Sequence, residues 1–320
     1  MTPAPLDTLD SEAVGQGTNR VHLTALPMPT ARTVLAEQPE APHASAEPLP
    51  QPVAVVPDGV PERLTDRYGR TVRDLRLSIT DRCNLRCTYC MPAQGLEWLP
   101  TPDLLTTAEL TRLGRLAVER LGVERIRLTG GEPLLRRDLE EIIASLSTLR
   151  TSSGRKPDIA LTTNGLGLER RAAGLREAGL DRVNVSVDSL DPRDYAAITR
   201  RDRLVDVLAG IAGAQEAGLA PIKVNAVAMP ATVEERAPQL LAESLRRGWQ
   251  LRFIEHMPLG PRQTWRSQDV VGVDQILGAL RAAGFVLTEA GRPDRRPAAL
   301  WRVAAGAHAG RSYPAGSVGI

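Results

Sequence analysis

The sequence is poor in cysteine, lysine and aromatic residues, and it has no long apolar run. Its 320 residues include three cysteines, and aromatic residues make up 3%. An odd number of thiols without a secretory signal argues against a disulfide framework. No apolar run approaches the roughly 20 residues of a membrane span. We therefore expect a cytoplasmic protein with no membrane partner.

The chain also has no marked excess of charge of either sign. Forty Lys and Arg residues oppose 38 Asp and Glu residues, which gives a net charge of +2. Such a balance does not predict a nucleic acid as a partner. Only Lys156 and Lys223 are lysines, which raises the question of what each of them does.

All three cysteines lie in one short stretch. Cys83, Cys87 and Cys90 form the pattern Cys-x3-Cys-x2-Cys. Apolar and polar residues alternate over 75–79, which is the period of a strand with one buried face. The spacing therefore predicts a loop of thiols just past the end of a strand.

Three thiolates on a short loop suit an iron–sulfur cluster or zinc. Structural zinc takes four protein ligands, and a cubane is usually held by four cysteines, so three cysteines leave one metal position open. A small molecule can bind to an open iron, which is useful in an enzyme. The alternative is a zinc loop completed by a distant histidine, most plausibly His256.

From residue 75 the sequence repeats a strand–loop–helix pattern, which predicts an α/β fold with a parallel sheet. Polar residues lie at or near the carboxyl end of every predicted strand, as on the catalytic face of a β/α barrel. A doubly wound sheet, the alternative, would concentrate them at one switch point. The six predicted strands span 75–79, 125–129, 159–163, 182–187, 222–228 and 250–254.

The two ends of the chain differ from this pattern. Residues 1–60 carry 10 of the 25 prolines and have no sustained hydrophobic period. This composition cannot bury enough apolar surface to offset the cost of ordering the chain, so we expect a disordered extension. After a helix predicted over 273–283, the sequence ends in a Gly-rich tail, where Val318 and Ile320 are typical of the start of a strand.

A second motif, Gly130-Gly-Glu-Pro133, follows the second predicted strand. Together with the cysteine pattern, it resembles the radical S-adenosylmethionine (SAM) superfamily. The resemblance implies an incomplete six-unit β/α barrel over 61–260. It also implies one 4Fe-4S cluster whose open iron binds SAM, and an electron from the cluster that cleaves SAM to a 5′-deoxyadenosyl radical.

Six further segments, in order along the chain, resemble the GTP 3′,8-cyclases of molybdenum cofactor biosynthesis. They are 75–81, 127–133, 162–165, 184–190, 223–225 and 252–258. The resemblance implies Cys83, Cys87 and Cys90 as cluster ligands. It implies four SAM contacts, namely Tyr89, Gly131, Ser186 and Met257, and four GTP contacts, namely Arg76, Arg127, Thr162 and Lys223.

The chemistry of the GTP contacts agrees with their placement. A triphosphate needs fixed cations, for which Arg offers a bidentate fork and Lys a point charge. Strand alternation places Arg76 on the face opposite the leucines, and Arg127 lies inside the second strand. We expect that face to be the barrel lumen, where an unpaired charge costs several kcal/mol.

The sequence differs from the family at its carboxyl end. The family holds a second 4Fe-4S cluster with three C-terminal cysteines, whereas no cysteine follows Cys90 here. We therefore expect residues 261–320 to be an incomplete C-terminal region, without the second cluster and with impaired turnover of GTP.

The leading hypothesis is cyclisation of GTP to 3′,8-cyclo-7,8-dihydro-GTP, the first step of molybdopterin biosynthesis. It implies an external electron donor, a next pathway enzyme that receives the product, and a homodimer as the candidate assembly. Two alternatives stay open. One is a single-cluster radical SAM enzyme with another substrate, and the other is a non-catalytic remnant that binds SAM or a nucleotide.

Overall fold

We analysed the protein as a computed structural model, which describes residues 63–65, 70–230, 232–257, 266, 269–291 and 298–320. The chain divides into two units, 1–49 and 50–320, and every described residue belongs to the second. The predicted disordered extension over 1–60 lies outside the described residues, as does part of the region 261–320. The domain boundaries stay predictions.

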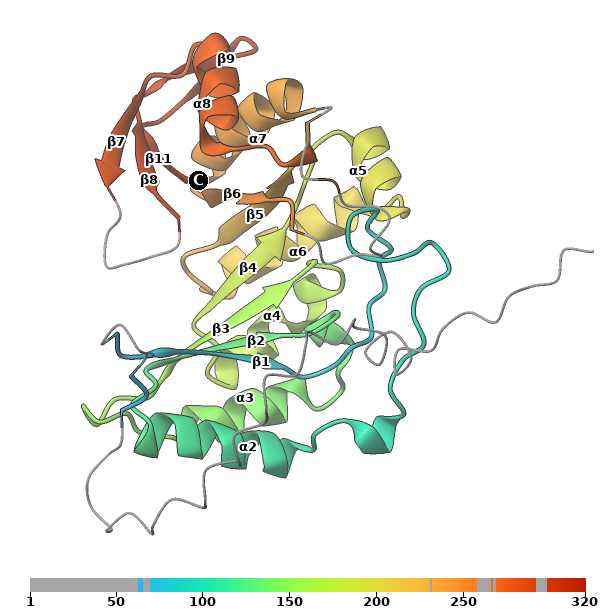
Figure 1. Cartoon of the computed structure of the whole chain (residues 1–320), viewed down its shortest axis with the longest axis vertical. Coiled ribbons are helices and arrows are strands. Elements are labelled where there is room, and N and C mark those ends of the chain that lie inside the picture. The colour runs from blue at the N-terminus through green and yellow to red at the C-terminus, as the bar shows by residue number, and fades with distance from the viewer. Residues whose placement is uncertain (1–62, 66–69, 231, 258–265, 267–268, 292–297) are drawn as a thin grey trace, which may run out of the picture. The chain divides into compact units, whose positions relative to one another are not determined.

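Six parallel strands form the main part of the sheet (Figure 1). They are β1 Asp74–Ser78, β2 Arg125–Thr129, β3 Asp158–Thr163, β4 Arg182–Ser186, β5 Lys223–Ala228 and β6 Gln250–Glu255. Each strand pairs with the next one along the chain. A doubly wound sheet reverses its strand order at a switch point. The unbroken order therefore confirms the barrel-type winding over that alternative.

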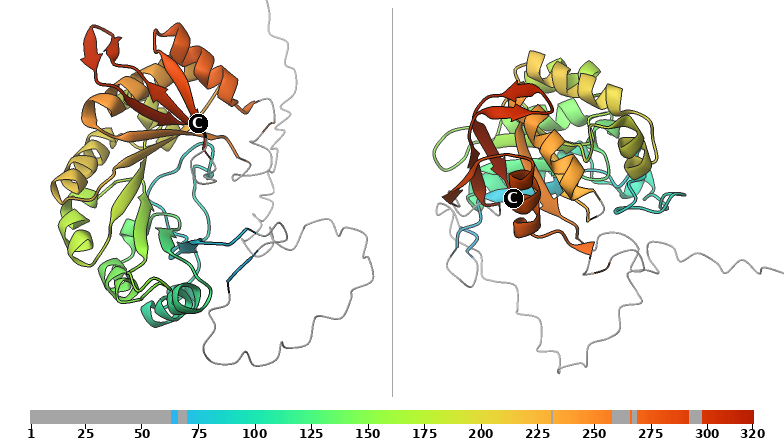
Figure 2. Two further views of the ribbon diagram at one scale, coloured as in Figure 1. Left: turned by 90° about the vertical axis from the view of Figure 1, so that its left-hand side faces the viewer. Right: turned by 90° about the horizontal axis from the view of Figure 1, so that it is seen from above.

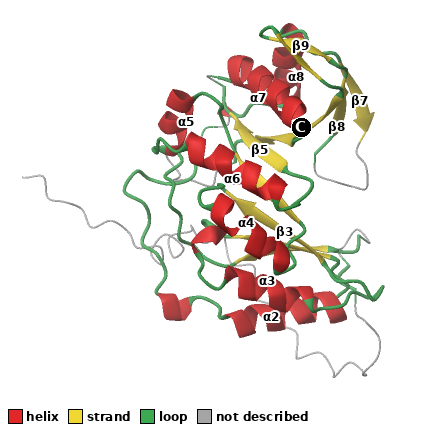
Figure 3. Ribbon diagram, turned by 180° about the vertical axis from the view of Figure 1, so that it is seen from behind, coloured by secondary structure: helices red, strands yellow, loops and turns green. Residues whose placement is uncertain are grey.

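Helices connect these strands and lie on the outer side of the curved sheet (Figures 2 and 3). They are α2 Thr107–Arg115, α3 Leu139–Ser147, α4 Leu168–Glu177, α5 Pro192–Thr199, α6 Leu204–Glu216 and α7 Val233–Arg247, with short turns η1 Thr101–Asp103, η2 Leu116–Arg120 and η3 Pro133–Leu135. No helix among the described residues is both long and apolar enough to cross a membrane.

The sequence pattern did not predict α5 as a separate helix. Pro192 occupies its first turn, and the side chain of Asp191 accepts hydrogen bonds from the backbone N–H groups of Arg193 and Asp194. This is a typical N-cap, because the carboxylate satisfies donors that have no partner within the helix.

One face of the sheet packs against the helices and forms the core. Its residues alternate along each strand and are at most 4% exposed in β2 to β5. They include Ile126, Leu128, Ile159, Leu161, Val183, Val185, Val224 and Ala226. Burial of an apolar side chain of this size contributes roughly 1.5–3 kcal/mol. The opposite face carries the polar residues described below.

The region after β6 extends this sheet and adds a separate two-stranded sheet. It comprises α8 Val273–Ala282, β7 Leu287–Gly291, β8 Leu300–Val303, β9 Gly306–His308, β10 Arg311–Tyr313 and β11 Gly316–Gly319. Strand β11 pairs in parallel with β6 and antiparallel with β8, which pairs with β7. Among the described strands, β1 and β7 are the two edges, so this part of the sheet does not close into a barrel. The strand at Val318 is confirmed, whereas the other four strands were not predicted.

Candidate active site

The cysteine loop follows β1 at the carboxyl end of that strand. The N–H groups of Cys90 and Met91 both donate to the carbonyl of Cys87, at 3.0 Å, which holds the last two cysteines in one turn. Leu85 and Met91 are buried, so the loop is anchored to the protein between its thiols. The predicted placement of the cysteines past a strand end is therefore confirmed.

Burial raises the pKa of all three thiols. The pKa of Cys87 rises to about 12, first through burial and then through the charges of Asp188 and Cys83. Burial also raises the pKa of Cys83 and Cys90. The thiols are therefore neutral at pH 7, and only a bound cation would make the thiolate forms favourable. Among the described residues, no three His, Cys, Asp or Glu side chains are arranged to hold a metal ion.

The glycine pair after β2 lies directly against the cysteine loop. The N–H of Gly131 donates to the carbonyl of Thr80 at 2.7 Å. A Cβ atom on Gly131 would lie 2.3 Å from the carbonyl oxygens of Asp81 and Arg82. Only glycine allows two backbones to approach so closely. The two motifs that carry the resemblance are thus in contact.

Glu132 ties the ends of β2 and β3 together. It is 1% exposed, and its carboxylate accepts from the Thr163 hydroxyl at 2.7 Å, from the N–H of Asn164 at 2.6 Å and from the N–H of Leu134 at 2.9 Å. Burial raises its pKa, while these three donors act in the opposite direction. A buried carboxylate with three donors is satisfied, so Glu132 fixes the shape of the turn.

Tyr89 reaches from the cysteine loop to the ends of β4 and β6. Its hydroxyl donates to Oδ2 of Asp188 at 2.7 Å, and Oδ1 of Asp188 accepts from the N–H of Val227 at 2.8 Å. The rings of Tyr89 and His256 meet edge to face, with centroids 6.2 Å apart. Asp188 and His256 therefore position a predicted SAM contact, a relationship that the sequence pattern did not predict.

Five of the predicted site residues, the four GTP contacts and Ser186, lie on one face of the sheet. Strand register places Arg76 opposite Arg127, and places Thr162 and Lys223 on either side of Asn184. In each strand the apolar residues next to them point the other way, into the core. We call this surface the polar face, and it consists of Arg76, Arg127, Thr162, Arg182, Asn184, Ser186, Lys223, Asn225 and Arg252.

The expected burial of the charged residues on the polar face holds for Lys223 and Arg127 but not for Arg76. Lys223 is 9% exposed and Arg127 is half-buried, as a lumen position requires. Arg76 is exposed, however, because β1 is an edge strand of an open sheet. The expected burial of Arg76 was therefore wrong. Arg76 still faces Arg127 in register.

A row of three guanidinium groups crosses the polar face. Arg127 and Arg182 lie opposite Ala160 on its two sides, and Arg76 lies opposite Arg127. Burial and the charges of Arg76 and Arg182 lower the pKa of Arg127. The Nε atoms of Arg127 and Arg182 are buried and have no hydrogen-bond partner among the described residues. Nη1 of Arg182 is paired with Asp158, so that charge is partly compensated. The two Nε donors without a described partner suit an anionic ligand.

The sequence analysis did not name Arg182 and Asn184 as site residues, although Asn184 begins the segment 184–190. Arg182, Asn184 and Ser186 alternate with valines in β4, so the period-two argument used for Arg76 would have indicated Arg182 and Asn184. The Asn184 amide donates to the hydroxyl of Thr162 at 3.2 Å, and its Oδ1 atom is buried without a described partner. Asn184 therefore has an open acceptor on this face.

Comparison with known proteins places this site in a family. The model of the radical SAM superfamily matches residues 77–242. The chain is 58% identical over 241 residues to the GTP 3′,8-cyclase of Corynebacterium glutamicum, covering 75% of this chain and 64% of the relative. It is 49% identical over 298 residues to GTP 3′,8-cyclase 2 of Mycobacterium tuberculosis, covering 93% and 77%. The chain belongs to the GTP 3′,8-cyclase family of radical SAM proteins.

The solved structure of HydG, a maturase of the [FeFe]-hydrogenase, shares the fold. Its TM-score is 0.50 at 13% identity, covering 65% of this chain and 48% of HydG. At this identity the likeness concerns the fold alone. The chain spans 64% of the C. glutamicum relative's length, which is less than two thirds.

Radical SAM membership implies a 4Fe-4S cluster and SAM, and the residues present fit both. Three thiols on one loop are the donors that iron prefers. The N–H of Gly131 donates to the carbonyl of Thr80. The carbonyl of Gly131 is the group at this residue that can accept a hydrogen bond from the amino group of SAM.

Proposed function

We propose that this chain carries out the radical cyclisation of GTP to 3′,8-cyclo-7,8-dihydro-GTP, the first step of molybdopterin biosynthesis. The observation that carries the proposal is the row of guanidinium groups on the polar face, on the same sheet whose first strand leads into the cysteine loop. A triphosphate is the ligand that such a row suits.

Cys83, Cys87 and Cys90 would hold the cluster by sulfur, with one iron left for SAM. When bound, the cluster and SAM supply a 5′-deoxyadenosyl radical that can remove a hydrogen atom from carbon. The role of the chain is to keep substrate and SAM at a fixed separation, because near-attack geometry requires reacting atoms about 3–3.5 Å apart.

Four residues would hold SAM. The carbonyl of Gly131 would accept from its amino group. Tyr89, whose hydroxyl donates to Asp188, would contact SAM from the cysteine loop. Ser186 ends β4 and offers a hydroxyl near the ribose. Met257 is 50% exposed just past β6 and offers an apolar side chain to the adenine.

Arg76, Arg127, Thr162 and Lys223 would bind GTP, and the row adds Arg182 to them. The two buried Nε donors of Arg127 and Arg182 would find acceptors in phosphate oxygens. This exchange favours binding, because each buried donor without a partner costs about 1–3 kcal/mol.

The proposal also includes an external one-electron donor, since the cluster must be reduced before SAM is cleaved, and an enzyme that receives the product. A homodimer, a cytoplasmic location, the lack of a second cluster and an impaired turnover stay predictions. The 320 residues contain no cysteine beyond the three of the loop.

The test is product analysis with the anaerobically reconstituted chain. GTP, SAM and dithionite should yield 5′-deoxyadenosine together with a cyclised nucleotide that is isomeric with GTP and separable by chromatography. The expected impairment predicts less than one cyclised molecule per 5′-deoxyadenosine. Formation of 5′-deoxyadenosine with GTP recovered unchanged would contradict the proposal and favour another substrate.

A further inference from the structure

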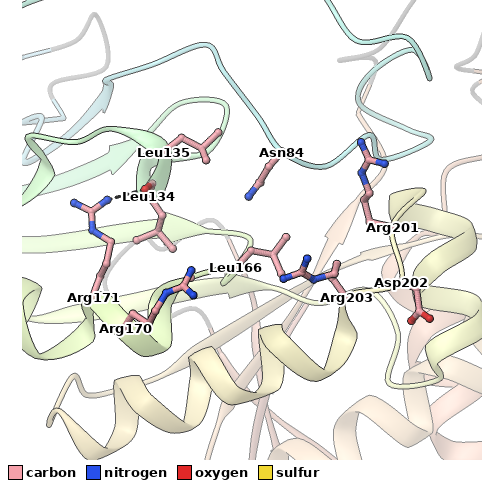
Figure 4. A pocket seen from close by; sticks show the side chains of 10 residues that line it. Asn84, Leu134, Leu135, Leu166, Arg170, Arg171, Arg201, Asp202 and Arg203 are labelled. Atoms are coloured by element: carbon pink, nitrogen blue, oxygen red, sulfur yellow. Dashed lines mark hydrogen bonds between the residues drawn. The ribbon is translucent and has the colours of Figure 1, made fainter.

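An open pocket of about 510 Å³ lies beside the cysteine loop, outside the polar face. Leu134 and Leu135 of η3 line one side, Arg170 at the start of α4 a second, and the segment 201–203 before α6 a third. Asn84 points into it from the cysteine loop (Figure 4). We call it the arginine pocket.

The arginine pocket carries a small excess of positive charge. Its lining includes four arginines and one acidic residue, Asp202. Arg171 is engaged by Glu140 and by two backbone carbonyls, and Arg203 by Asp206. The side chains of Arg170 and Arg201 are exposed and make no hydrogen bond or ion pair with any described residue. Two guanidinium groups without a described partner thus lie beside the apolar part of the pocket lining, in which Leu135 is 44% exposed.

The wall of the pocket is hydrogen-bonded to the cysteine loop. The N–H of Arg86 donates to the carbonyl of Thr199 at 3.0 Å, and that of Thr88 to Ile198 at 2.9 Å. The backbone of Arg200 has the left-handed conformation, with φ 55°. Its Nη1 group donates a hydrogen bond to the carbonyl of Arg86 at 2.7 Å. The basic segment after α5 and the loop that carries the thiols therefore form one connected unit.

The pocket also approaches the first cysteine directly. Asn84 follows Cys83 directly in the chain, and its Oδ1 atom accepts a hydrogen bond from the side-chain amide of Asn164 at 2.7 Å. Electron tunnelling decreases steeply with distance. A redox group seated at this pocket would therefore be near a cluster held by Cys83. None of the residues that line the pocket belongs to the polar face, so a partner here would not compete with GTP.

We propose that the arginine pocket is the docking surface for an acidic protein that carries a flavin as its one-electron reductant. The inference rests on the proposed function, which requires such a donor. The donor's reduced group loses one electron, the cluster held by the three cysteines gains it, and no bond of this chain is made or broken. Charge complementarity makes the encounter fast and dependent on salt.

The test uses the reconstituted full chain and oxidised flavodoxin, an acidic flavoprotein, as the probe. The variant Arg170→Glu/Arg201→Glu is compared with Arg112→Glu/Arg115→Glu, which changes the net charge equally on the exposed face of α2. Calorimetric titration at about 20 mM and 300 mM salt should show that the pocket variant binds flavodoxin at least about tenfold more weakly at low salt. The control should change the affinity less than about twofold.

A second readout separates docking from chemistry. Formation of 5′-deoxyadenosine driven by reduced flavodoxin should fall in the pocket variant, while formation driven by dithionite should stay at the wild-type rate. Equal effects of the two double variants, no flavodoxin binding by the wild type, or a loss of GTP affinity in the pocket variant would each overturn the docking proposal. Pocket-dependent binding with no dithionite-driven product in the wild type would instead contradict the proposed function.

Discussion

Arg127 and Arg182 lie on the two sides of Ala160, at one level of the sheet and on one face. Burial and the charges of Arg76 and Arg182 lower the pKa of Arg127, while Nη1 of Arg182 is itself paired with Asp158. The buried Nε atoms of Arg127 and Arg182 have no partner among the described residues. This relationship is the clearest sign that the chain is built to meet an anion at this place.

The first prediction concerns Arg182, which the motifs did not indicate. Arg182→Gln should weaken GTP binding at least about tenfold, because a hydrogen bond to a charged group contributes roughly 1.5–3 kcal/mol. Equilibrium dialysis of GTP against the reconstituted chain measures the effect. Arg176→Gln, at the end of α4 on the outer side of the sheet, is the control and should leave the affinity unchanged. Equal affinities of the wild type and Arg182→Gln would exclude Arg182 from the GTP site.

The second prediction concerns the cluster. Any of Cys83→Ala, Cys87→Ala or Cys90→Ala should abolish iron binding, since three cysteines leave no spare ligand. Tyr89→Phe is the matched control within the same loop. It loses the hydrogen bond to Asp188 but no cysteine, and should keep about four iron and four sulfide per chain. Stoichiometric zinc without iron in the wild type would contradict the assignment.

A third prediction follows from the contact between the two motifs. Gly131→Ala places a Cβ atom against two backbone carbonyls of the cysteine loop, neither of which can rotate away. Both the affinity for SAM and the unfolding temperature should fall. Gly278→Ala in α8 meets no atom within 4 Å and should be neutral or stabilising by up to about 1 kcal/mol. Unchanged SAM affinity in Gly131→Ala would show that the loop can move aside.

Asp138 provides a pH test away from the thiols. Hydrogen bonds from Arg136 at 2.8 and 3.0 Å lower its pKa from the usual 3.8 to about 2. Because the pKa is lowered in the folded state, this contribution to stability is complete above pH 4 and is lost as the pH falls toward 2. Urea unfolding of the wild type should lose on the order of 1 kcal/mol over that range, a value limited by partial solvent screening.

The same experiment has a built-in comparison. Asp138→Asn should be less stable than the wild type at pH 7 and should lack this part of the pH dependence. Arg136 also donates to the carbonyls of Ile79 and Leu105, both at 2.7 Å, so it joins the end of β1 to the segment before α2. Parallel pH profiles of the two proteins would show that Asp138 does not stabilise this junction.

Much of this arrangement follows from local sequence. The alternation of Ile126 and Leu128 with Arg127 determines a strand and its two faces, because side chains alternate with period two. The cysteine loop and the glycine turn were predicted by their spacing. Their contact was not, since it depends on a backbone approach between Gly131 and Thr80, which are far apart in sequence.

The rest could not be predicted from local patterns. Strands β7 to β10 are three to five residues long, and the hairpin strand β9 contains Gly306 and Ala307, so their period is too short to recognise. The exposure of Arg76 depends on which strand forms the edge of the sheet, a property of the whole topology. The cysteine loop contacts the end of α5 through a backbone hydrogen bond from residue 86 to residue 199. Because this bond does not depend on the side chains, no sequence pattern indicates it.

The most direct test of the account is the fate of the hydrogen atom on C3′ of the GTP ribose. The reconstituted chain is incubated without oxygen with SAM, dithionite and GTP deuterated at C3′, and the 5′-deoxyadenosine is analysed by mass spectrometry. If the polar face holds GTP against SAM as proposed, 5′-deoxyadenosine should carry deuterium, and Arg127→Gln should reduce the deuterated fraction. 5′-Deoxyadenosine that forms with no deuterium above background would contradict the account.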